Sequence, residues 1–332
     1  MSGFRWQKQF VACNLCGEDD CETLFQQDQH WLGLRTVMCR RCGLIYLNPR
    51  PAIADYDRFY GDRYHQLYPS RAAFHSGALG SRIVAEAARL RRKAYEQYFS
   101  GEVRMLEVGC GEGAFLKALG DANPGWSLQG IDLAPAEVAA CREKGLQVAC
   151  GRLEDSSTDP QTHVAAFHVL EHALDPLAML QEMASRIEPN GYLFLEVPNI
   201  FGSWYGLGMI HVAHPYQFAP HTLTAMVRRV GLSILRWEEV ENPLLPSSLR
   251  VIAQRSRRRS LRAPQMPAVA EVQAMFDRKL AHWRRELTMN WLVRYGTLWI
   301  GSRLRNWLWE RTAGRRWQAL LLSTAQVSNS HP

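Results

Sequence analysis

A glycine-rich loop between an apolar strand and a helix is the feature that most constrains this fold. Residues 103–108 are typical of a buried strand and run directly into Gly109, Gly111 and Gly113. Glycines let the backbone pass close beneath a ligand, and the first amides of the helix after the loop face an anion. About 20 positions later Asp132 ends the next apolar run, where a carboxylate can accept hydrogen bonds from both hydroxyls of a ribose. The pattern predicts an α/β nucleotide-binding domain.

Two cysteine pairs mark a second module near the N-terminus. Cys13-x-x-Cys16 and Cys39-x-x-Cys42 are each followed by a glycine, which permits the tight turn that points sulfur inward. Four thiolates at this spacing can meet tetrahedrally on zinc. Scattered cysteines or a redox pair are the alternatives, and the doubled spacing favours zinc. Because all four ligands are cysteines, no coordination position stays open, and we expect a structural Zn²⁺ in a zinc-ribbon module over residues 1–50.

Length and charge limit what else the chain can do. At 332 residues it has room for one medium domain plus smaller attachments. The sequence shows no apolar run long enough to span a membrane and no secretory signal, so we expect a cytoplasmic protein. The net charge of +7 is concentrated after Arg250. A nucleic-acid partner is therefore not expected, whereas local attraction of the tail to phosphate or anionic lipid stays open.

The glycine loop alone does not choose the ligand, because it also satisfies a relaxed dinucleotide fingerprint, and an NAD(P)-dependent oxidoreductase is an alternative. Three further features favour another ligand. Glu107 stands two residues before the first glycine, where a carboxylate can face a cationic amino group. Glu154 and Asp155 come after the third expected strand and suit an adenine amino group. The fourth expected strand ends in Phe-His-Val-Leu-Glu-His, residues 167–172.

Taken in order, these motifs resemble class I S-adenosylmethionine-dependent methyltransferases. The likeness rests on Glu-Val-Gly-Cys-Gly-Glu-Gly at 107–113, the Ile-Asp step at 131–132, Leu-Glu-Asp at 153–155 and His-Val-Leu-Glu-His at 168–172. It continues through 187–199 and 221–232. With the cysteine pairs in front, the chain resembles zinc-ribbon-fused bacterial methyltransferases, many of which belong to sugar or surface-polysaccharide pathways. The match covers roughly residues 10–254.

The resemblance implies a Rossmann-like, doubly wound sheet of seven strands with the seventh antiparallel. We expect these strands near 103–108, 127–131, 146–150, 163–167, 191–197, 233–239 and 248–254. Residues 318–327 could instead supply the last strand, but 248–254 comes after the sixth by a shorter loop. The resemblance also implies which residues bind S-adenosylmethionine: Glu107, Gly109, Gly111, Gly113, Asp132, Leu133, Glu154, Asp155 and Phe167.

Methyl transfer from a sulfonium is an in-line displacement, so catalysis is mainly alignment of the acceptor. An oxygen or carbon acceptor must also lose a proton, which calls for a base. His214, in the loop where this family closes over substrate, is our first candidate, followed by His168 and His172, with Tyr216 as a substrate contact. The resemblance implies a sugar or nucleotide-sugar acceptor.

The remaining segments complete the predicted organisation. Residues 51–100 form a helical linker or lid after an irregular, proline-stiffened stretch at 48–51. Residues 101–254 form the catalytic domain, and 255–332 form a basic, tryptophan-rich helical extension. This extension suits a homodimer interface or a peripheral membrane contact. A non-catalytic adaptor that keeps the ribbon is the third hypothesis, against which the intact acids of the nucleotide site argue.

Overall fold

The computed structural model describes residues 7–26, 34–59, 78–156, 159–202, 210–242, 245–256, 261–262 and 264–281. The chain divides into two compact units, Met1–Val272 and Gln273–Pro332, and the first of them contains the three described sheets and the candidate site. Most of the predicted C-terminal extension, including residues 318–327, lies outside the described residues. Within the described part, no helix has both the length and the apolar character needed to cross a membrane.

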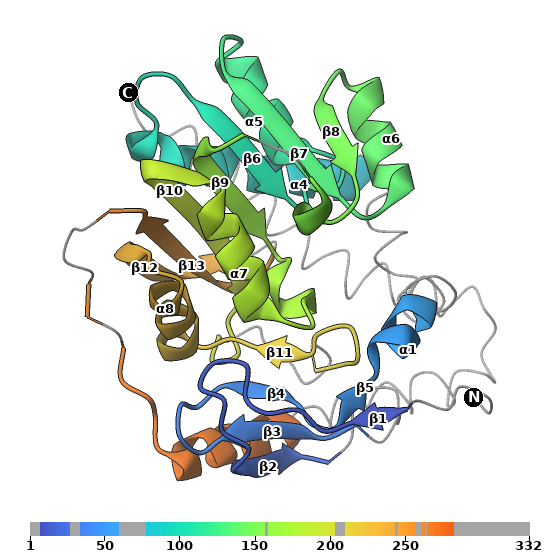
Figure 1. Ribbon diagram of the computed structural model, residues 1–332, viewed down its shortest axis with the longest axis vertical. Coiled ribbons are helices and arrows are strands. Elements are labelled where there is room, and N and C mark those ends of the chain that lie inside the picture. Colours follow the sequence, from blue (N-terminus) through green and yellow to red (C-terminus); the bar gives the residue numbers. More distant parts are fainter. Residues whose placement is uncertain are drawn as a thin grey trace, which may run out of the picture. The chain divides into compact units, whose positions relative to one another are not determined.

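Seven strands form one mixed sheet in the order β12-β13-β10-β9-β6-β7-β8 (Figure 1). Their bounds are β6 Arg104–Val108, β7 Ser127–Asp132, β8 Gln147–Cys150, β9 Gln161–Phe167, β10 Ile187–Pro198, β12 Ser233–Asn242 and β13 Leu245–Gln254. Neighbours from β10 to β8 run parallel, and β13 is antiparallel to both β10 and β12. The predicted doubly wound sheet is confirmed, with the segment 248–254 as its antiparallel strand.

Helices cover both faces of this sheet, because alternate side chains of each buried strand point to opposite sides. One core joins Met105, Ala165 and Phe194 to Tyr95 of α4 and Phe115 of α5. The opposite core joins the intervening strand residues to α7 and α8. The helix bounds are α4 Ala78–Tyr95, α5 Ala114–Ala122, α6 Pro135–Glu143, α7 Pro176–Ser185 and α8 Pro220–Arg229, with short 3₁₀ turns η2 Glu96–Tyr98, η3 Leu153–Asp155 and η4 Leu170–His172.

The cysteine module forms its own small sheet, in the order β11-β4-β3-β2. Its strands are β2 Cys21–Phe25, β3 Thr36–Cys39, β4 Ile45–Leu47 and β11 Tyr216–Gln217. The last of these comes from the methyltransferase-like part of the chain, after β10, and pairs antiparallel with β4. The module is therefore completed by a strand contributed from the main domain, which the sequence did not predict.

Residues 48–51, which were predicted to be irregular, include a short strand. Arg50 and Pro51 form the short strand β5, which pairs with β1 (Lys8–Gln9). Proline is tolerated at the edge of a sheet because its missing N–H is not needed there. Helix α1 (Ile53–Arg58) comes next, and Tyr56 and Phe59 are buried in a cluster beside the ribbon. These two aromatic side chains therefore pack in the core.

A buried ion network fastens α4 to the sheet. The Glu196 carboxylate, on β10, accepts hydrogen bonds from Arg91 Nε at 2.7 Å and from Arg250 Nε at 2.9 Å. It also accepts one from the Tyr95 hydroxyl at 3.0 Å. Arg250 also contacts Glu238 Oε1 at 2.7 Å. Burial alone would raise the pKa of Glu196, but the charges of Arg91 and Arg250 outweigh it and hold that pKa at about 2.

Replacing Glu196 by glutamine is expected to destabilise the protein by about 3–5 kcal/mol, because two buried guanidinium groups lose their counter-charge. Since the folded pKa lies below the unfolded one, the wild-type network contributes fully above about pH 4.5 and loses its contribution as the pH falls toward about 2. Urea unfolding at pH 7 and pH 3 measures both effects. The control Glu188→Gln breaks a partly exposed pair with Arg104 and should destabilise the protein much less; equal losses would contradict the assignment.

Candidate functional site

The glycine loop lies at the carboxyl end of β6, between that strand and α5. Gly109, Gly111 and Gly113 all have positive φ values, of 67°, 53° and 72°. A side chain at Gly109 would meet Val169 Cγ2 at 2.3 Å, so only glycine fits the approach of the loop to the segment after β9. Gly113 is the left-handed N-cap of α5, so the free amides of the first turn face the loop.

Asp132 is held in place by this loop. Its Oδ2 accepts from the Gly111 amide at 2.8 Å, and its Oδ1 accepts from the Ala134 amide at 2.9 Å. Each carboxylate oxygen keeps a second lone-pair direction for a ligand hydroxyl. The next side chain, Leu133, is 66% exposed. A large apolar side chain on the surface beside a carboxylate suits the flat face of a purine ring.

Glu107 lies on β6, the strand that runs into the glycine loop. Its carboxyl is buried, and Oε2 has no hydrogen-bond partner among the residues that the structure describes. Burial, together with the charge of Asp132 and against the charge of Arg91, raises the pKa of Glu107 to about 8. A buried, unsatisfied carboxyl at the end of a central strand is the feature expected where a cationic ligand group binds.

The other predicted cofactor residues differ in their exposure to solvent. Glu154 and Asp155 are exposed in η3, which comes directly after β8, so they flank the edge where Asp132 ends β7. Phe167 is buried, stacks on Tyr95 and lies 4.6 Å beneath the Arg91 guanidinium. Its side chain therefore packs in the core instead of lining an open surface.

Histidines gather with Glu171 beyond the end of β9. His168 has a positive φ of 57°, which is uncommon for a residue with a side chain and often marks functional sites. Its Nδ1 lies 3.7 Å from Glu171 Oε1, and its Nε2 lies 3.4 Å from Ser248 Oγ. The rings of His172 and His214 meet edge to face at 4.6 Å. The structure thus brings together all three histidines predicted as base candidates.

Exposure separates these histidines. The His168 side chain is 26% exposed and that of His172 23%, whereas His214 is fully buried. His168 and His172 are therefore accessible to an acceptor to a similar extent, whereas His214 is not.

The fourth predicted catalytic residue, Tyr216, lies in the ribbon sheet. It is buried and stacks on Tyr46 at 6.1 Å. Arg50 Nη1 donates to its hydroxyl at 3.0 Å and to the carbonyl of Leu174 at 2.5 Å. Burial raises the pKa of Tyr216 to about 12 although Arg50 opposes the shift. Tyr216 thus links the cysteine module to the loop after η4.

A second link runs through Asn14, in the first cysteine knuckle. Its side chain donates to Asp175 at 2.9 Å and accepts from the Leu177 amide at 2.9 Å. Asp175 in turn caps α7 by accepting from Ala178. The module therefore supports both segments that carry the clustered histidines, one before α7 and one before β11.

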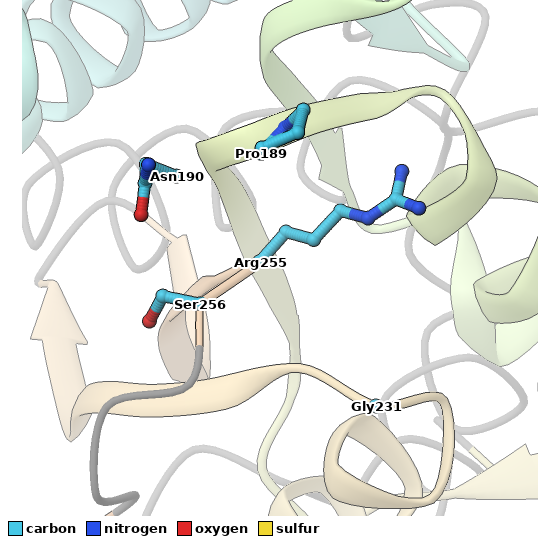
Figure 2. A pocket seen from close by; sticks show the side chains of 5 residues that line it. All are labelled: Pro189, Asn190, Gly231, Arg255 and Ser256. Atoms are coloured by element: carbon cyan, nitrogen blue, oxygen red, sulfur yellow. The ribbon is translucent and has the colours of Figure 1, made fainter.

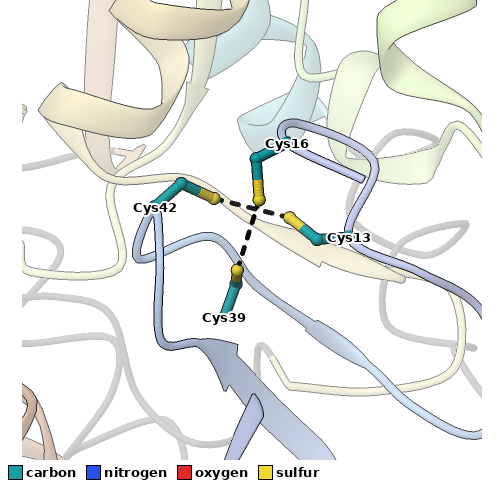
Figure 3. A group of neighbouring side chains, drawn as sticks. All are labelled: Cys13, Cys16, Cys39 and Cys42. Atoms are coloured by element: carbon teal, nitrogen blue, oxygen red, sulfur yellow. Dashed lines mark hydrogen bonds between the residues drawn. The ribbon is translucent and has the colours of Figure 1, made fainter. Parts of the chain in front are cut away.

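The four predicted zinc ligands converge from two knuckles (Figure 3). Cys13 Sγ lies 3.4 Å from Cys42 Sγ, and Cys16 Sγ lies 3.5 Å from Cys39 Sγ. Ligands at about 2.3 Å from a tetrahedral zinc are separated by similar distances. The hydrogen bond from Cys42 lowers the pKa of Cys13 to about 5, whereas burial raises the pKa of Cys39 to about 11. The donor set and its geometry fit Zn²⁺.

A shallow hollow of about 360 Å³ lies elsewhere, lined by Pro189, Asn190, Gly231, Arg255 and Ser256 (Figure 2). It sits at the start of β10, whereas the glycine loop comes after the end of β6. Because β6, β9 and β10 run parallel, the hollow and the glycine loop are at opposite ends of the sheet. The hollow therefore plays no part in the candidate site.

Sequence reasoning missed two residues of the site. Arg91 is one of several basic residues in a helix, and nothing in the pattern singles it out. Glu171 lies inside the His-Val-Leu-Glu-His motif without a predicted role, although an acid directly beside one histidine and three residues from another was a usable signal. The Arg50–Tyr216 contact depends on residues 166 positions apart and had no local signal.

Comparison with known families agrees with this geometry. A family model described as a methyltransferase domain matches residues 59–236. Ubiquinone biosynthesis O-methyltransferase of Paracidovorax citrulli is 29% identical over 164 residues, which cover 42% of this chain and 68% of that relative. The corresponding enzyme of Xylella fastidiosa strain 9a5c is 31% identical over 152 residues, covering 40% and 61%. The chain thus spans about three fifths to two thirds of the length of these relatives.

Among solved structures, a SAM dependent methyltransferase from Archaeoglobus fulgidus has a TM-score of 0.44 and 21% identity, covering 57% of this chain and 99% of that chain. Magnesium protoporphyrin IX methyltransferase from Synechocystis with bound SAH has a TM-score of 0.46 and 15% identity, covering 62% and 100%.

Proposed function

The chain belongs to the methyltransferase-domain family and is an S-adenosylmethionine-dependent methyltransferase, and we propose that its acceptor is a phenolic hydroxyl of a small molecule. The curated relatives are O-methyltransferases named for ubiquinone biosynthesis, which supports oxygen as the methylated atom and a phenol as the acceptor class. The sugar acceptor predicted from the sequence finds no support among these relatives and is not retained. The observation that carries the site assignment is the buried Glu107 carboxyl, beside Asp132 and the glycine loop.

In this proposal the loop and its acids orient the cofactor. Asp132 accepts hydrogen bonds from the ribose hydroxyls, Leu133 contacts adenine, and Glu107 pairs with the amino group. The glycines at 109, 111 and 113 leave room for the cofactor to lie against the backbone. S-adenosylmethionine would supply the methyl group on its sulfonium, and the histidines beyond β9 would line the side from which the acceptor oxygen approaches in line with that group.

The acceptor hydroxyl loses its proton to His168 in this proposal. The sequence favoured His214, but that side chain is fully buried, whereas the His168 side chain is 26% exposed at the end of β9. The acceptor oxygen bonds to the methyl carbon while the carbon–sulfur bond breaks, and the electron pair stays on sulfur.

The direct test incubates the full chain with S-adenosylmethionine and a panel of phenols, catechols, sugars and nucleotide sugars, followed by mass spectrometry for an added methylene. We expect product from phenolic acceptors. His168→Asn should lower kcat about 10²–10⁴-fold and leave S-adenosylhomocysteine affinity within about twofold. Product from sugars alone would contradict the acceptor class, and an undiminished kcat would exclude His168 as the base.

The four-cysteine zinc site enters this proposal as a structural element that positions the acceptor side. Cytoplasmic location, a homodimer and membrane contact through the basic tail stay predictions from the sequence.

A further inference from the structure

Three side chains able to bind a metal meet beyond the end of β9, apart from the cysteine cluster. Glu171 and His172 belong to η4, and His214 lies two residues before β11. One ligand atom from each lies within 4.8 Å of the others. We propose that Glu171, His172 and His214 bind a divalent transition-metal ion beside the acceptor site.

His172 is oriented as a metal ligand. Its Nδ1 lies 2.7 Å from the carbonyl oxygen of Ala213. Because a carbonyl oxygen only accepts, Nδ1 carries the proton and Nε2 carries the lone pair. Metal-bound histidines in proteins are commonly held in this way, with the other ring nitrogen donating to a backbone carbonyl. His172 Nε2 faces Glu171 Oε1 at 3.9 Å, within the span of two ligands that lie at about 2.0–2.2 Å from one ion.

Glu171 supplies the charge that such an ion needs. The residue is 2% exposed, and among the described residues neither carboxylate oxygen has a hydrogen-bond partner. The nearest histidine nitrogens, at 3.7 and 3.9 Å, are beyond hydrogen-bond distance. A buried carboxylate without hydrogen bonds is costly, and a bound cation removes that cost.

His214 completes one face of the site. It is fully buried between the rings of His172, at 4.6 Å, and His211, at 4.1 Å. It also comes directly after Ala213, whose carbonyl orients His172. If the distances between the three ligand atoms shortened by about 1 Å, the atoms would have the spacing of ligands around one ion. The segment 211–217 therefore supplies both a ligand and the group that fixes another ligand.

The ligand set indicates the class of ion and its role. Two imidazoles and one carboxylate suit Zn²⁺, Mn²⁺, Fe²⁺ or Co²⁺, in contrast to the thiolates of the ribbon. Three protein ligands leave positions open, as in catalytic sites. The role of the ion, although not its binding, rests on the proposed function. A phenolic oxygen in an open position would be coordinated, lose its proton more readily to His168, and attack the methyl carbon as the carbon–sulfur bond breaks.

The test uses the full chain with its cysteine site loaded with zinc, and Mn²⁺ as the probe, measured by electron paramagnetic resonance. We expect one Mn²⁺ to bind per chain. Glu171→Gln and His172→Asn should each weaken Mn²⁺ binding at least about tenfold while S-adenosylhomocysteine binding and unfolding midpoints stay near wild type. The matched control is His163→Asn, which changes a buried histidine on β9 that faces Tyr98 and Thr162, and it should leave Mn²⁺ binding unchanged.

Two results would overturn the metal site. One is the absence of Mn²⁺, Co²⁺ or a second Zn²⁺ bound to the wild-type chain. The other is Mn²⁺ affinity that is unchanged in both Glu171→Gln and His172→Asn. Because the measurement of Mn²⁺ binding does not require turnover, its outcome is independent of the proposed methyl transfer. If Mn²⁺ bound but no phenol were methylated, the acceptor assignment would be wrong and the metal site would stand. If phenols were methylated at the full rate without a bound ion, the metal site would be wrong and the acceptor assignment would stand.

Discussion

Raising the pH from 6 to 8 is expected to tighten S-adenosylmethionine binding about 50-fold in all, and Glu107→Gln is expected to abolish this dependence. In the free protein the pKa of Glu107 is about 8 because the carboxyl is buried, so the group is protonated below that pH. Pairing with the cofactor's cationic amino group requires the carboxylate, and binding therefore releases one proton. Isothermal titration calorimetry in buffers of different ionisation enthalpy measures both the affinity and the proton. At pH 8 the variant should bind at least about 100-fold more weakly.

The pH dependence of unfolding distinguishes a loss of cofactor binding in Glu107→Gln from misfolding of the variant. The folded pKa of Glu107 lies above its ordinary value near 4.5, so between these limits the folded state holds a proton that the unfolded state has lost. Stability of the free protein therefore falls as pH rises from about 4.5 to 8, and Glu107→Gln should remove that fall. The matched variant Asp132→Asn should weaken binding while keeping the pH slope. A wild-type affinity that does not change between pH 6 and 8 would contradict the role of Glu107.

Much of the main domain could be predicted because its signals are local. An apolar strand, a glycine loop and an acid at the end of the next strand are contiguous in the chain, and their backbone requirements are strict. Gly109 illustrates this: its positive φ and its contact with Val169 leave no room for a side chain. The same locality explains why the two cysteine knuckles predicted the convergence of four thiols.

What the sequence could not predict comes from pairing between distant segments. Tyr216 looked like a substrate contact because it lies close after His214, but pairing of β11 with β4 turns it into the ribbon sheet. His214 was favoured because it lies in the loop where this family closes over substrate, but its side chain is fully buried. Arg91 reaches Glu196 only because α4 crosses the sheet. Each outcome depends on long-range register, which a local pattern does not encode.

This long-range pairing joins the cysteine module to the segment that carries His214, so the proposed acceptor side is expected to depend on the module. Cys39→Ser, or removal of zinc by a chelator, is expected to lower methyl transfer at least about 100-fold while cofactor affinity stays within about twofold. Structural zinc supplies about 10–16 kcal/mol of folding free energy in isolated zinc modules, so its loss unfolds the ribbon. Without the ribbon, the residue before β11 loses the bond from the Leu47 amide to the Pro215 carbonyl. Asp175, before α7, and the Leu177 amide, in its first turn, lose their bonds to Asn14. The glycine loop and Asp132 make no such contacts with the ribbon among the described residues.

The matched control is Cys21→Ser, because Cys21 lies on β2 of the same sheet and outside the four-thiol cluster. It should keep zinc content and activity. Turnover measured beside S-adenosylhomocysteine titration distinguishes loss of the acceptor side from loss of the whole fold. If Cys39→Ser lost cofactor binding together with activity, the ribbon would be needed for the whole domain. If it kept both activity and the wild-type unfolding midpoint, the ribbon would be an appendage, and the supporting roles of Asn14 and Arg50 would be refuted.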